Sequence, residues 1–151
     1  MGTAAGRASD VASVLNDLIE TNRDGELGFK KAAEEAREPD LKGLFTKYSL
    51  QRAQNVTELQ RAVAGLGEKP ATSGSVTGTL HRGWMDVKTA VSKREDKALI
   101  EEAEAGEDAA VKNYQEALAK SLPPDVLSLI QRQFSGIQEA HNTIRDLKHG
   151  T

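Results

Sequence analysis

The sequence has no cysteine among its 151 residues, which excludes disulfide bonds, thiolate metal sites and thiol catalysis within the chain. This absence suits a reducing compartment, and we expect a cytoplasmic protein. The net charge is only −3 and both signs are interspersed, so there is no electrostatic case for a nucleic-acid surface. No stretch approaches 18 consecutive apolar residues, so the sequence predicts no membrane span.

Several enzyme signatures are also missing. No segment alternates with period two, so we expect no strands and therefore no phosphate-binding loop of the strand–loop–helix kind. No Ser-His-Asp set is suggested, because the three histidines (His81, His141 and His149) are scattered. Residues 1–8 lack the apolar centre of a signal peptide, and we expect them to form a flexible tail.

Apolar residues recur in alternating steps of three and four, the pattern of helices that bury one face in a bundle. The pattern predicts an all-α fold, with a single domain over residues 9–150. Pro39 fits the first turn of the second long helix, and Pro123-Pro124 start the last one. The predicted helices cover residues 9–37, 39–66, 79–91, 93–120 and 123–148.

Part of the sequence is repeated at a spacing of 81 residues. Between Leu18 and Ala36, 8 of 19 positions are identical to those of the second copy, where ordinary composition gives roughly one or two. The identical pairs are Leu18/Leu99, Ile19/Ile100, Glu20/Glu101, Gly25/Gly106, Glu26/Glu107, Lys31/Lys112, Glu35/Glu116 and Ala36/Ala117. We interpret the chain as a repeated helical hairpin, and two such hairpins build a four-helix bundle.

The segment between the hairpins decides the topology. A helix of 30 residues is about 45 Å long, and the segment from Gly67 to Ser92 could run that distance. This favours a long crossover that leaves the second and third long helices parallel, with a short helix around Trp84 along the outside. The alternative is an up-down bundle in which this short helix caps one end.

Four segments carry a family resemblance that extends from about Asp10 to Lys148. They are Asp24-Gly25 with Gly28-Phe29, Gly74-Ser75-Val76 to His81-Arg82-Gly83-Trp84-Met85, Gly106-Glu107-Asp108-Ala109-Ala110, and Leu122-Pro123-Pro124. In these segments the chain resembles an uncharacterised bacterial family of four-helix-bundle proteins in the ferritin-like superfamily. The resemblance implies a ferritin-like crossover topology and no particular activity. Because the superfamily includes iron-oxidising and iron-storing members, it raises the question of a metal centre.

A di-iron centre in such a bundle takes one Glu from each of two helices and a Glu-x-x-His motif from each of the other two. Glu26 and Glu107, or Glu20 and Glu101, could supply the first half. The second half is missing. The second helix has no histidine, and Gln138 stands three residues before His141 in the last helix. We therefore expect no metal and no other cofactor. If iron is bound, the candidate ligands are Glu20, Glu26, Glu101, Glu107 and His141.

Arg52 lies on the apolar stripe near the middle of its helix, at the depth of Glu26 and Glu107. This coincidence predicts a buried polar cluster of Glu26, Arg52 and Glu107 in the volume that a metal pair would fill. Gly25 and Gly106, at the same depth, indicate either close helix packing or a small pocket, and the sequence leaves both open.

Taken together, these patterns predict a non-enzymatic bundle protein that acts by self-association, as in a homodimer, or by binding a protein partner. Nucleic-acid and membrane partners are not expected. The alternative is an iron-binding or ferroxidase-like carboxylate protein, and a binder of a small ligand would need a pocket near the two glycines.

Overall fold

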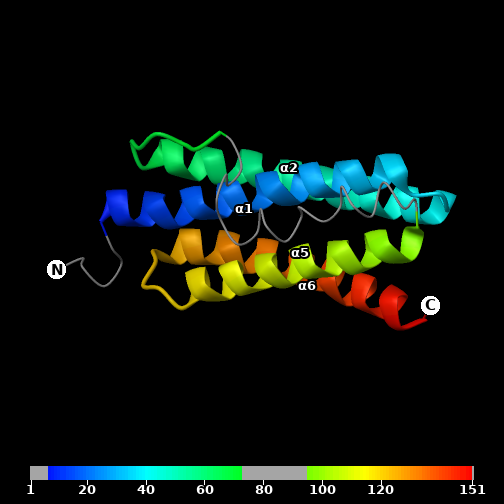
Figure 1. Cartoon of the computed structure of the whole chain (residues 1–151). Helices are drawn as coiled ribbons and strands as arrows, with labels where there is room; N and C mark the ends of the chain where they lie inside the picture. The colour runs from blue at the N-terminus through cyan, green and yellow to red at the C-terminus, as the bar shows by residue number, and fades with distance from the viewer. Residues whose placement is uncertain (1–6, 73–94, 151) are drawn as a thin grey trace.

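The computed structural model describes residues 7–72 and 95–150 as four long helices that lie side by side (Figure 1). These helices are α1 (Ala8–Glu35), α2 (Pro39–Gly65), α5 (Asp96–Leu118) and α6 (Pro124–Gly150). Pro39 and Pro124 occupy the first positions of α2 and α6, where a missing N–H costs nothing, and Pro123 directly precedes α6. Gly67, with φ +77°, follows the end of α2.

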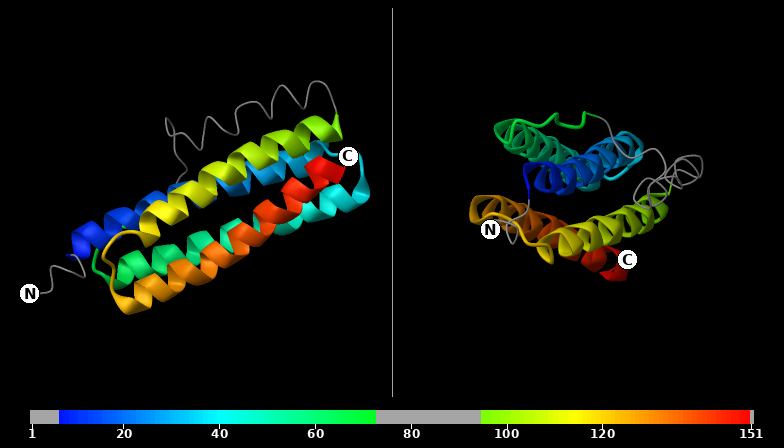
Figure 2. Two further views of the ribbon diagram at one scale, coloured as in Figure 1. Left: turned by 90° about the horizontal axis from the view of Figure 1, so that it is seen from below. Right: turned by 90° about the vertical axis from the view of Figure 1, so that its left-hand side faces the viewer.

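The helices form two antiparallel hairpins that pack against each other. In the first hairpin, Asn55 of α2 bonds Asn22 of α1, and Lys42 bonds the carbonyl of Ala33, so the two helices run in opposite directions. Helix α5 is also antiparallel to α1, since Asn113 bonds Thr21 while Asp96 bonds the backbone of Arg37. Helices α2 and α5 are therefore parallel, as the two further views show (Figure 2).

Because α2 and α5 are parallel, the end of α2 and the start of α5 lie at opposite ends of the bundle. After α2, residues 69–72 lie along α1. Asn16 bonds the carbonyl of Lys69 and the N–H of Ala71, and further along α1 Arg23 bonds the carbonyl of Thr72. The short helix expected at 79–91, with Trp84, lies outside the described residues.

Most of the buried side chains are apolar, and they follow the predicted stripes of all four helices. Fully buried members include Leu15, Leu18, Phe29, Phe45, Leu59, Leu99, Ile130, Ile137 and Ile144. The repeat-related pairs Leu18/Leu99 and Ile19/Ile100 are all buried, whereas the duplication itself stays an interpretation of the sequence. None of the helices in the described part of the chain combines the length and apolar character that membrane crossing requires.

Candidate functional site

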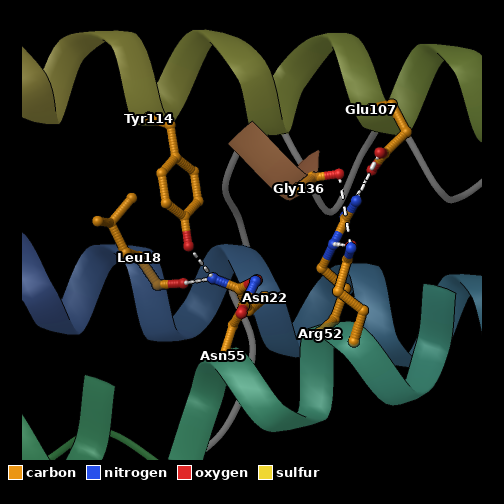
Figure 3. Close-up of polar contacts among 8 residues, drawn as sticks. Leu18, Asn22, Arg52, Asn55, Glu107, Tyr114 and Gly136 are labelled. Carbon is orange, nitrogen blue, oxygen red and sulfur yellow. Dashed lines mark hydrogen bonds and ion pairs between the residues drawn. The ribbon is translucent and has the colours of Figure 1, made fainter. Parts of the chain in front are cut away.

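The centre of the bundle holds a buried ion pair between Arg52 of α2 and Glu107 of α5. Both guanidinium Nη atoms donate to the two carboxylate oxygens at 2.5 Å, which is a bidentate arrangement (Figure 3). The side chains are 1% and 0% exposed. Each charge therefore depends on the other, because neither has bulk water to replace its partner.

Neighbouring groups from α1 and α2 make room for Arg52 and hold it in place. The guanidinium carbon lies 5.2 Å from the centre of the Phe29 ring, and Nε donates to the side-chain oxygen of Gln51 at 3.1 Å. Gly25 faces the same side chain, and a β-carbon there would lie 3.1 Å from an Arg52 Nη atom. For Gly25, the alternatives of close packing and a pocket resolve to close packing against an arginine.

Glu26 does not belong to this cluster, which corrects the predicted group of three. Its carboxylate bonds Arg23, one turn earlier on α1, at 2.6 Å, in a pair that is partly exposed. Both glutamates directly follow a buried glycine, so their place in the helical turn does not separate them. They differ in the partner that each side chain meets: Glu107 faces Arg52 across the core, whereas Glu26 faces Arg23 on its own helix. The repeat thus aligns two glutamates of which Glu107 is buried and Glu26 reaches the surface.

A second polar group crosses the core with one side chain from each helix: Asn22, Asn55, Tyr114 and Gln133. Asn22 accepts a bond from Asn55 at 3.0 Å and donates to the hydroxyl of Tyr114 at 2.7 Å (Figure 3). Tyr114 donates to Gln133 at 2.8 Å. We refer to these four residues as the core network. It links all four helices through hydrogen bonds that are shielded from water.

The core network reaches the surface through Gln133, whose amide donates to Glu58 at 2.9 Å. Burial raises the pKa of Tyr114 well above its usual range, although the hydrogen bond from Asn22 opposes the shift. Sequence reasoning did not find this network. The available signal was Asn22, a polar residue on an apolar stripe, but no pattern along the chain identifies its partners.

The five candidate metal ligands do not come together in one group. Glu107 is paired with Arg52, Glu26 is paired with Arg23, and Glu101 is exposed. His141 pairs with Asp108, with Nε2 and Oδ1 2.5 Å apart. Glu20 is half-buried, and burial, followed by the nearby Asp17, raises its pKa. Within residues 7–72 and 95–150, no three acidic or histidine side chains are grouped as metal ligands would be.

The donor set at the bundle centre does not fit the di-iron centre that a ferritin-like fold implies. Such a centre needs several carboxylates around a dication. Here Glu107 is the candidate carboxylate in the core, and the cation beside it is a guanidinium, which would repel a metal ion. The arrangement has the chemistry of a structural ion pair and supplies no open coordination position.

Comparisons with known proteins agree with this fold. Over residues 10–120 the chain matches the family model described as "Domain of unknown function (DUF2383)". No curated protein sequence matches it.

Two solved structures are similar in fold. One is a two-domain protein from Anabaena variabilis with DJ-1/ThiJ/PfpI-like and ferritin-like domains (15% identity, TM-score 0.77, covering 97% of this chain and 38% of that one). The other is a point mutant of Dps1 from Mycobacterium smegmatis (15% identity, TM-score 0.73, covering 93% of this chain and 96% of that one). The family match and the four-helix architecture lead to one conclusion: the chain belongs to the DUF2383 family, and its four-helix bundle is similar in fold to a ferritin-like domain and to Dps1.

Proposed function

We propose that this protein acts by associating with a second copy of itself through the outer face of the α1–α2 hairpin. The observation that carries the proposal is a pair of exposed leucines, Leu27 on α1 and Leu50 on α2, which are 59% and 66% exposed. Ser49 bonds the carbonyl of Glu26 at 2.9 Å, so the two leucines lie at the same level of the hairpin.

The surface next to Leu50 supports a symmetric contact. A groove of about 430 Å³ begins at Leu50 and is lined by residues of both helices, namely Glu26, Lys30, Ala33, Glu34, Thr46 and Ser49. A two-fold interface places the same patch on both subunits, so the patch has to complement itself. Two apolar side chains beside charges of both signs meet this requirement.

The interior supports the same proposal by offering little for catalysis. The polar groups at its centre bond one another, and Arg52 and Glu107 neutralise each other. We infer that the protein is not an enzyme and that its interior is structural.

Association is tested by measuring molar mass at several protein concentrations with light scattering after size exclusion. We expect the wild type to form a dimer, and Leu27→Glu with Leu50→Glu to leave a folded monomer. Ser135→Glu, at an exposed position on α6, is the matched control and should remain dimeric. A wild type that is monomeric at all concentrations, or a double variant that still dimerises, would contradict the proposal.

The iron alternative has its own test. Protein purified without a metal-affinity tag is offered ferrous iron under anaerobic conditions, and the bound metal is measured by elemental analysis. We expect no stoichiometric iron. About two irons per chain, lost on changing Glu26 and Glu107, would instead indicate a carboxylate metal centre.

A further inference from the structure

A cleft of about 500 Å³ lies at the end of the bundle where the α1–α2 turn meets the start of α5 and the end of α6. It lies closer to the α1–α2 turn than Leu27 and Leu50 do, and none of the residues of the core network line it. Its size is in the range of pockets that hold small molecules. The elements around it come from both hairpins, so their packing shapes the cleft.

The interior of the cleft is apolar. Leu41 and Ile100 are almost fully buried there, and Leu44 and Leu147 are half-buried. Leu44 of α2 and Leu147 of α6 therefore supply most of the apolar surface that an occupant can reach, and this surface suits a hydrocarbon chain. An occupant that removed this surface from water would gain roughly 25 cal/mol for each Å² of apolar area buried.

The rim of the cleft is mostly acidic. Glu38, Asp40 and Asp96 contribute three carboxylates, against the single ammonium of Lys97. Asp96 is held in place because its two oxygens accept the backbone N–H groups of Arg37 and Glu38 at 2.8 and 3.0 Å. Glu38 and Asp40 form no ion pair with another described residue.

We propose that this cleft binds an amphiphilic organic cation, with an aliphatic chain against the leucines and an ammonium head at the acidic rim. Charge complementarity selects this class, since the rim carries an excess of two negative charges and the interior is apolar. An aliphatic anion of the same length would meet the same hydrocarbon surface and the opposite electrostatics. The proposal is independent of dimerisation.

The test uses octylammonium as the probe and octanoate as the matched anion, both at concentrations where they do not aggregate. Binding is followed by isothermal calorimetry and by amide chemical shifts of the whole chain. We expect saturable binding of octylammonium, with shifts concentrated at Leu44, Ile100 and Leu147, and binding of octanoate at least tenfold weaker.

Three variants separate charge from packing. Glu38→Gln with Asp40→Asn should weaken octylammonium about fivefold, in line with the modest strength of exposed charge interactions. Lys97→Met should strengthen octylammonium and weaken octanoate, opposite changes that a general loss of structure would not produce. Leu50→Asn, on the α1–α2 face, should leave the binding of both probes unchanged. Equal binding of the two probes, or no saturable binding of octylammonium, would overturn the proposal.

Discussion

Arg52 and Glu107 are each stable in the core only while the other is present, because both are buried and fully paired. Arg52→Met alone leaves an uncompensated carboxylate and should lower the free energy of unfolding by about 3–5 kcal/mol. The double variant Arg52→Met with Glu107→Leu should lie within about 1 kcal/mol of the wild type, since an apolar pair can replace a buried ion pair. Denaturant unfolding of the wild type, the two single variants and the double variant measures the coupling free energy between the two side chains.

Arg23 provides the matched control for this cycle, because it also pairs with a single glutamate, Glu26, but in a partly exposed position. Arg23→Met should cost no more than about 1 kcal/mol. If Arg52→Met were as mild as Arg23→Met, the buried pair would have no special weight in the fold.

Tyr114 makes stability depend on pH in the alkaline range. Its pKa in the folded protein is raised by burial above the ordinary value of 10.0, so above pH 10 the unfolded chain loses this proton first. The unfolded state is then favoured, and stability should fall by up to about 1.4 kcal/mol per pH unit as the pH rises from 10 towards the folded-state pKa.

Tyr114→Phe removes this contribution, so its stability should fall less steeply between pH 10 and pH 11 than that of the wild type. Urea unfolding at half-unit pH intervals gives both slopes. Parallel slopes would mean that the buried hydroxyl is not the titrating group.

At the scale of single helices, Gly25 and Gly43 both lie within a helix, but their surroundings differ. A β-carbon at Gly43 meets nothing within 4 Å, so Gly43→Ala should stabilise the protein by about 1 kcal/mol through helix propensity. A β-carbon at Gly25 would press on Arg52, which its bidentate bond holds in place. Gly25→Ala should therefore destabilise, and thermal unfolding of the two variants would show opposite shifts.

Helix positions were accessible from sequence because they depend on local signals. Pro39 and Pro124 mark where α2 and α6 begin, and the apolar stripes give the buried faces. The polar contacts at the centre of the bundle were harder to predict. The depth of Arg52 along its helix was readable, but which of the two repeat-related glutamates reaches Arg52 depends on how the helices pack against one another. The partners of Asn22 come from other helices, and no local pattern encodes such contacts.

At the scale of the whole molecule, Asp96 joins the two hairpins at one end of the bundle. Its carboxylate accepts two backbone N–H groups from the α1–α2 turn, where those groups precede the first turn of α2. Asp96→Ala should cost about 1–2 kcal/mol, as the loss of a charged capping group does. Asp125→Ala, in the first turn of α6, is the control and should cost clearly less. If chemical unfolding showed equal losses of stability for the two variants, the link that Asp96 makes between the hairpins would add nothing to the free energy of unfolding.

The parallel course of α2 and α5 also fixes where the described chain starts and stops. Helices α1 and α6 run in the same direction, so Ala8 and Gly150 lie at opposite ends of the bundle (Figure 1). A helix of this length spans about 40 Å. Two fluorescent proteins fused before α1 and after α6 would thus be held apart by a stiff rod of nearly fixed length. Energy transfer between them would be set by that length, and it would fall when the chain unfolds and its ends move further apart.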